Sequence, residues 1–242
     1  MSSEGLALPR RHVVAAHQPA YLPWLGYFHR IARADTFVFL DDVQFEKNSY
    51  TNRNQIKTKA GPLWLTVPVC KGGHTSTTML STMVDDRTNW RRKHLESIRQ
   101  AYSRAPHFEA CFGRLEELYG EQEVLLKDVC LRHLMFWMRV LDLKTKVIQL
   151  HELQVSERKS ALVLAICKAL SADTYISGPF GRDYLDMALF QEAGVAVEFD
   201  RFVHPTYPQL HGAFVPNLGI VDAWMNLGGA ISSLLAPTAR GH

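Results

Sequence analysis

The feature that most constrains the fold is an alternation of short apolar runs with helical patterns. Residues 13–16 are an apolar run, residues 24–34 repeat apolar side chains at helical spacing, and residues 36–40 are a second β-rich run. Parallel strands need a crossover between them, and this crossover is usually a helix. The pattern therefore predicts an α/β fold with a mostly parallel, Rossmann-like sheet and helices on both faces.

The same alternation returns in the second half of the chain. We expect strands at 146–150, 174–177 and 195–199, helices at 159–170 and 184–193, and a last helix near 220–227. Three consecutive helical patterns lie between residues 89 and 143. We interpret residues 1–242 as a single α/β domain with a helical insertion at about 85–145.

The segment between the second strand and the insertion has a less regular apolar pattern. Residues 43–60 are polar and lack a strong period, whereas residues 63–69 are a third strand candidate. Pro68 places that strand at an edge of a sheet or ends it, because proline cannot donate to a strand ladder.

Charge and cysteine content limit the functional classes. The net charge is only +3, and the basic residues are scattered, so we expect no binding to duplex DNA. The four cysteines lack metal-site spacing. No apolar stretch has the length of a signal peptide or a membrane span, which predicts a cytoplasmic protein without membrane insertion.

Polar segments that follow the predicted strands are candidate site regions, because ligands of open parallel sheets bind beyond the carboxyl ends of strands. The first segment starts with His17 and Gln18, and prolines and aromatic residues, including Tyr21 and Trp24, follow. His17 is a candidate general base because the pKa of free imidazole lies near neutrality. The alternative is that His17 only satisfies backbone groups.

The second segment follows the strand at 36–40. Asp41 and Asp42 end this strand, and Asn52 and Arg53 follow in a stretch dense in hydrogen-bonding side chains. Such a stretch suits a sugar, a nucleotide or a phosphate, because arginine can bind an anion through two parallel hydrogen bonds. The alternative is an ordinary acidic strand end followed by a solvated loop.

The third segment, residues 177–184, is a turn between a strand and a helix. Its backbone amides near Gly178 could hold an anion, although the segment matches neither a P-loop nor a dinucleotide fingerprint. In the alternative reading, its glycines only make the turn and Asp183 caps the helix that contains Tyr184.

The fourth segment is a proline-rich stretch from residue 204 to 217, too long for a mere connection. It contains His204, a second candidate base, together with Tyr207 and Asn217. Separately, Cys70 follows a strand pattern and precedes a KGGH stretch, so a thiolate nucleophile at this position is a further hypothesis.

Six stretches together resemble the WbqC-like protein family, across about residues 13–228. They are HQPAYLPWLGYFHRI, FLDDVQFEKNSYTNRNQIK, WLTVPV, NWRRKHLESI, SGPFGRDYLD and HPTYPQLHGAFVPNLGIVD. That family is associated with bacterial O-antigen and other surface-sugar gene clusters, and a glycine transferase role has been suggested for a member. The resemblance implies a site lined by His17, Gln18, Pro19, Tyr21, Leu22, Pro23, Asp41, Asp42, Asn52, Arg53, Asp183, Tyr184, His204, Pro205, Tyr207 and Asn217.

The chemistry that the resemblance implies is amide formation on a small amine, such as an amino sugar. The donor would be an acyl group on a carrier protein or an aminoacyl ester, and we expect no cofactor. His17 or His204 would deprotonate the amine, and Asp41 or Asp42 would orient the base or the ammonium group. Asn52 and Arg53 would hold an anionic part of a substrate, and the backbone near Gly178 and Gly181 would stabilise an oxyanion.

Two other functions also fit the sequence. The stretch PWLGY lies where nucleotidylyltransferases carry a P-x-H-x-G-H turn, but Trp24 and Tyr27 replace both histidines. A nucleotidyl- or nucleotide-sugar-processing enzyme is thus one alternative. The other is a non-catalytic binding protein of a biosynthetic complex, with the helical insertion as its docking surface.

Overall fold

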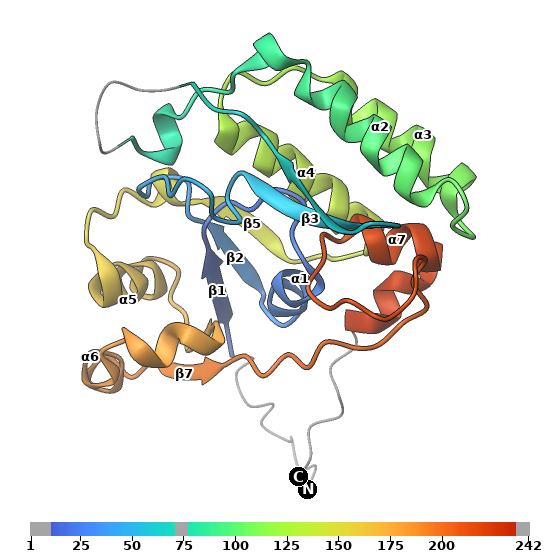
Figure 1. Ribbon diagram of the computed structural model, residues 1–242. Coiled ribbons are helices and arrows are strands. Elements are labelled where there is room, and N and C mark those ends of the chain that lie inside the picture. Colours follow the sequence, from blue (N-terminus) through green and yellow to red (C-terminus); the bar gives the residue numbers. More distant parts are fainter. Residues whose placement is uncertain (1–10, 71–76, 236–242) are drawn as a thin grey trace, which may run out of the picture.

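The centre of the molecule is a five-stranded parallel sheet (Figure 1). The computed structural model describes residues 11–70 and 77–235, so the KGGH stretch lies outside the described residues. The strands are β1 (Val13–His17), β2 (Thr36–Phe39), β5 (Lys146–Gln149), β6 (Thr174–Ser177) and β7 (Ala196–Phe199). Their order is β5-β2-β1-β6-β7, and each neighbouring pair is parallel. The prediction of an α/β fold with a mostly parallel sheet is confirmed.

The order of the strands reverses between β1 and β6. The chain runs outward from β1 through β2 to β5, and then returns to build β6 and β7 on the other side of β1. In an open α/β sheet, the connections diverge at such a point and leave a crevice beyond the carboxyl ends of the two strands. His17 ends β1 and Ser177 ends β6, so these two positions flank the crevice.

Helices cover both faces of the sheet because successive strand residues point to opposite sides. Val14 and Ala16 belong to the buried cluster on the side of α5 (Lys159–Ala169) and α6 (Met187–Glu192). Ala15, between them, belongs to the cluster that contains α1 (Leu25–Ala32). Figure 1 shows α5 and α6 on one side of the sheet and α1 on the other.

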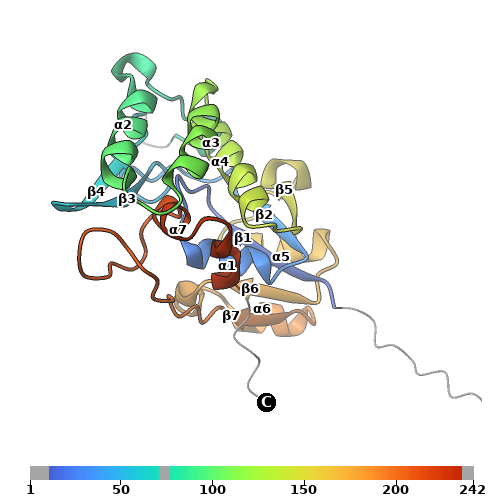
Figure 2. The same ribbon diagram turned by 90° about the vertical axis from the view of Figure 1, so that its right-hand side faces the viewer.

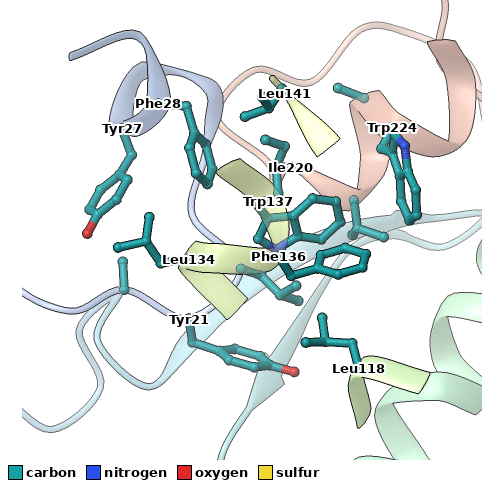
Figure 3. Packing of buried hydrophobic residues seen from close by; sticks show 14 of the residues in the cluster. Tyr21, Tyr27, Phe28, Leu118, Leu134, Phe136, Trp137, Leu141, Ile220 and Trp224 are labelled. Atoms are coloured by element: carbon teal, nitrogen blue, oxygen red, sulfur yellow. The ribbon is translucent and has the colours of Figure 1, made fainter. Parts of the chain in front are cut away.

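The second cluster extends beyond the sheet into a layer of helices. This layer contains α2 (Trp90–Tyr102), α3 (Phe108–Gly120), α4 (Leu126–Val140) and α7 (Val221–Leu227). Trp137 of α4 is fully buried and packs edge-on against Trp224 of α7, with ring centroids 5.3 Å apart (Figure 3). Each large apolar side chain buried here stabilises the fold by about 1.5–3 kcal/mol. The helical layer and one face of the sheet therefore share one hydrophobic core.

A separate antiparallel hairpin joins β3 (Arg53–Thr58) to β4 (Gly61–Thr66) and lies beside α2 (Figure 2). The sequence indicates a strand near β4 but not β3, because residues 43–60 lack an apolar period. The buried side chains of β3 include Asn54 and Lys57, which donate to the carbonyl oxygens of Leu22 and Ala213, both at 2.6 Å. Hydrogen bonds replace apolar contacts on the inner face of this strand, so its sequence lacks the apolar alternation that would predict a strand.

Short 3-10 helices fill several connections. They are η1 (Met79–Ser81), η2 (Asp86–Thr88), η3 (Leu150–Leu153), η4 (Pro179–Asp183) and η5 (Gly228–Leu235). Because η4 occupies the turn after β6, α6 begins at Met187 rather than at the predicted residue 184. Among the described residues, no helix has both the length and the apolar character that crossing a membrane requires.

Candidate functional site

A cavity of about 1330 Å³ opens at the point where the strand order reverses. Its wall combines the loop after β1, part of α1, the start of α5, η4 and the loop after β7. This volume exceeds the range of about 300–1,000 Å³ that is common for small-molecule pockets. We call this cavity the switch-point pocket; it can hold a ligand of nucleotide size or two smaller substrates together.

The loop between β1 and α1 is held in a strained shape. Leu22 is fully buried and has a φ of 45°, a left-handed conformation that costs energy for a residue of its size. Asn54 of β3 donates to the Leu22 carbonyl at 2.6 Å, and the amide of Ile220 donates to the Pro23 carbonyl at 2.8 Å. The hairpin and the chain before α7 thus fix the loop that carries His17 and Trp24 into the pocket.

His17 is oriented so that one ring nitrogen stays available. Nδ1 donates to the carbonyl of Gln18 at 2.9 Å, which leaves the lone pair on Nε2. Edge contacts with Trp24 and Tyr27, at centroid distances of 5.9 and 4.9 Å, hold the ring. Burial and, secondly, the positive charge of Arg30 lower the pKa of His17 to about 4. The imidazole is therefore neutral at neutral pH and can accept a proton at Nε2.

Arg30 of α1 is a buried cation in the pocket wall. It is 7% exposed, and its buried Nε has no hydrogen-bond partner among the other described residues. Its nearest carboxylate is Asp200, at 4.0 Å from Nε. Asp200 already accepts from Arg33 at 2.9 Å and lies 3.0 Å from Nδ1 of His29. Although burial opposes ionisation, the hydrogen bond from His29 and the charges of Arg30 and Arg33 hold the pKa of Asp200 below its ordinary value.

Exposed aromatic side chains surround the pocket. Trp24 lies 5.2 Å from Tyr50 between ring centroids, while Tyr184 and Phe180 are 55% and 78% exposed. Exposed aromatic faces can stack against a planar ligand group.

Eight of the predicted site residues line the pocket: His17, Gln18, Pro19, Trp24, Gly178, Gly181, Tyr184 and Asn217. They come from the loops after β1, β6 and β7, as expected for the carboxyl edge of a parallel sheet. The other predicted residues lie outside this lining: Tyr21, Leu22, Pro23, Asp41, Asp42, Asn52, Arg53, Asp183, His204, Pro205 and Tyr207.

Asp41 contacts His151, a residue that the sequence does not indicate as part of a site. Its fully buried carboxylate accepts from the amide of His151 at 3.2 Å and from His151 Nδ1 at 2.6 Å. His151 follows β5, which pairs with β2, and its side chain is 43% exposed. The neighbouring Asp42 is exposed.

His204 lies outside the pocket lining. Its ring contacts Phe202, a lining residue, at a centroid distance of 5.7 Å, and Nδ1 donates to the Pro205 carbonyl. Tyr207 is buried and donates to Asp222 of α7 at 2.8 Å. These contacts anchor the loop from residue 204 to 217 to the helical layer.

The remaining polar predictions belong to the hairpin and the core beside it. Arg53 stacks on Trp64 at 4.3 Å, and the Asn52 side chain donates to the Val67 carbonyl at 3.0 Å. Tyr21 is fully buried, and its hydroxyl contacts His94 of α2 and Tyr119 of α3. The structure thus gives these residues internal partners outside the pocket lining.

Comparisons with known proteins agree on one family. The model of the WbqC-like protein family matches residues 18–232. The chain is also 33% identical over 217 residues to the uncharacterized protein Rv1507c of Mycobacterium tuberculosis, a match that covers 89% of this chain and 94% of the relative. No solved structure matches the chain.

Proposed function

The chain belongs to the WbqC-like protein family, and from that premise we propose that it transfers an acyl or aminoacyl group to a small amine, such as the amine of a surface-polysaccharide sugar. The observation that carries the proposal is His17, a neutral histidine with a free Nε2 at the wall of a large cavity. A reaction that joins two substrates needs both a proton acceptor and room for both partners. The switch-point pocket offers the two together.

The reaction is a nucleophilic substitution at a carbonyl carbon. The amine nitrogen attacks the carbonyl of a thioester or ester donor, and a C–N bond forms. The nitrogen becomes strongly acidic as this bond forms, so a base with a pKa of about 4 can accept its proton. His17 then returns the proton to the leaving sulfur or oxygen as the C–S or C–O bond breaks.

Other pocket residues fit supporting roles. The side-chain amide of Gln18 makes no hydrogen bond to the rest of the described chain, so it is free to donate to the oxyanion. The amide of Gly181 already donates to the Gly178 carbonyl at 3.0 Å, which makes it a poorer donor for that role. Glu46 supplies a carboxylate in the same wall that can attract the amine.

The proposal assigns the base role to His17. His204 and Asp41 then stabilise the fold and take no part in the reaction. His204 does not line the cavity, and His151 donates to both oxygens of Asp41. We expect His17→Ala to lower amide formation by about 10²- to 10⁴-fold, whereas His204→Ala retains most of the activity.

The test is intact-mass analysis of amino sugars incubated with the protein and an acyl donor. Donors are offered both as carrier-protein thioesters and as aminoacyl esters, and His17→Ala and His204→Ala are assayed beside the unmodified chain. Undiminished amide formation by His17→Ala would rule out the scheme.

A second candidate function is the processing of a nucleotide or nucleotide sugar. Four basic residues in the pocket wall favour it: Arg30, Lys159, Arg182 and Arg201. Release of pyrophosphate from a nucleoside triphosphate in the presence of magnesium, without amide formation, would support this function over acyl transfer.

A further inference from the structure

We infer that the switch-point pocket binds a phosphate group of its substrate through Arg30, and that this substrate is a phosphorylated compound with a planar ring, of nucleotide size. The inference rests on the proposed function only in placing the substrate in this pocket. It adds the chemical class of that substrate and the residue that recognises it.

The first argument is the state of Arg30 itself. A buried guanidinium nitrogen without a hydrogen bond is costly, because it has lost water and gained no acceptor. Arg30 is 7% exposed, its Nε has no partner, and Asp200 at 4.0 Å is held by Arg33 and His29. A phosphate in the pocket would supply the missing acceptors, since arginine binds phosphate oxygens through two parallel hydrogen bonds.

The second argument is the space beside Arg30. A Cβ atom added to Gly178 would lie 2.9 Å from Nη2 of Arg30, closer than side-chain carbons approach. Glycine at this position therefore lets the end of β6 approach the guanidinium directly. A ligand group at the carboxyl end of β6 can reach Arg30 over the glycine backbone.

The third argument is the charge of the pocket as a whole. The wall contains Lys159, Arg182 and Arg201 in addition to Arg30, against the carboxylates of Glu46 and Asp200. Asp200 is matched by Arg33, which lies outside the lining. The excess of positive charge favours an anion, and more than one phosphate can be accommodated.

Aromatic side chains identify the rest of the substrate. Trp24, Tyr50 and Tyr184 belong to the same lining, and Tyr50 and Tyr184 are 45% and 55% exposed. They suit a planar ring by stacking. The cavity of about 1330 Å³ has room for a ring, a sugar and phosphates.

Binding of phosphate would also affect His17. The charge of Arg30 is one of the causes that lower the pKa of His17. A phosphate beside Arg30 would offset this charge and make His17 a stronger base when the substrate is present. Substrate binding and base strength are thereby coupled.

The experiment is isothermal titration of the full chain with inorganic pyrophosphate, uridine and adenosine 5′-diphosphates, and the two nucleosides without phosphate. We expect the diphosphates to bind and the nucleosides to bind at least 10-fold more weakly. Arg30→Met is expected to raise the Kd of the diphosphates about 10- to 100-fold. Gly178→Ala should raise it as well, because the new methyl group displaces the guanidinium while its charge is kept.

The control is Arg99→Met, which removes the same charge from an arginine of α2 that is 56% exposed and lies outside the pocket. Its Kd should stay within twofold of the unmodified chain. Circular dichroism melting of each variant shows whether it is folded, and Gly178→Ala provides the test if Arg30→Met does not fold. Equal affinity for nucleosides and diphosphates, or unchanged affinity in both Arg30→Met and Gly178→Ala, would overturn the inference.

The two proposals fail separately. Binding is measured without turnover, so each proposal has its own readout. Unchanged diphosphate affinity in Arg30→Met, together with lost amide formation in His17→Ala, would refute the phosphate site and retain the transferase. Lost affinity in Arg30→Met with normal amide formation in His17→Ala would retain the phosphate site and refute the catalytic scheme.

Discussion

The buried carboxylate of Asp41 accepts two hydrogen bonds from His151, one from its backbone amide and one from Nδ1. Asp41 follows β2 and His151 follows β5, and the parallel pairing of Phe39 with Gln149 brings the two residues together. The contact joins the ends of two neighbouring strands. It gives Asp41 a structural function that its position after a strand does not reveal.

Replacement of Asp41 by asparagine is expected to destabilise the fold by about 1–3 kcal/mol, because the side-chain amide nitrogen cannot accept from His151 and the remaining hydrogen bond loses its charged acceptor. Asp42→Asn, at the exposed neighbour, should change stability by less than about 0.5 kcal/mol. Urea unfolding of the two variants measures the difference. Equal stability would show that the contact contributes little.

Acid should destabilise the protein through its buried histidines. Burial lowers the pKa of His94 and of His133 to about 3, so both rings are neutral in the folded state. The unfolded chain binds these protons below pH 6.5, and stability must therefore fall as the pH drops from 6.5 toward 3. Each histidine accounts for about 2 kcal/mol between pH 7 and pH 5.

His133→Phe removes one of these groups, and its stability should fall less steeply between pH 7 and pH 5. Leu134→Ala, a substitution at a buried neighbour in α4, serves as the control. It should lower stability by about 2–5 kcal/mol without altering the slope against pH. Identical slopes for His133→Phe and the unmodified chain would contradict the expectation.

Two helical glycines should respond in opposite ways to alanine. Gly113 in α3 has open space around an added Cβ atom, so Gly113→Ala should stabilise the fold by about 0.5–1 kcal/mol. At Gly26 in α1, the same atom would lie 2.8 Å from Phe202, a residue of the pocket wall. Gly26→Ala should therefore give no gain. Thermal unfolding of both variants provides the comparison, and a similar rise in Tm for each would contradict it.

The network around Asp222 predicts an order among tyrosine substitutions. Tyr102 donates to Asp222 at 2.8 Å and also accepts from the amide of Lys57 at 3.0 Å, whereas Tyr207 donates to Asp222 and accepts from no backbone amide of the described residues. Tyr102→Phe should cost about 1–3 kcal/mol more than Tyr207→Phe, because it leaves a buried backbone amide without a partner. Chemical denaturation of the two variants tests this order. A larger loss of stability in Tyr207→Phe than in Tyr102→Phe would contradict it.

Regular periodicity made most of the fold predictable. The sequence predicts a strand at 174–177, the bounds that β6 has, and it predicts the other sheet strands to within one residue at each end. The sequence does not predict β3, because the inner face of this strand is polar and hydrogen-bonded. A strand that buries apolar side chains can be predicted from its sequence. A strand whose buried side chains are polar and hydrogen-bonded lacks the pattern on which the prediction depends.

The sequence by itself determined the alternation of strands and helices, and with it the edge of the sheet where His17, Gln18 and Gly178 meet. Only the tertiary structure decided that Arg30 is a buried cation in that pocket and that Asp41 belongs with His151. The physical reason is that periodicity is a local property, set by side chains a few residues apart. Burial of a charge and the choice of a distant partner depend on strand order and register, which no local pattern records.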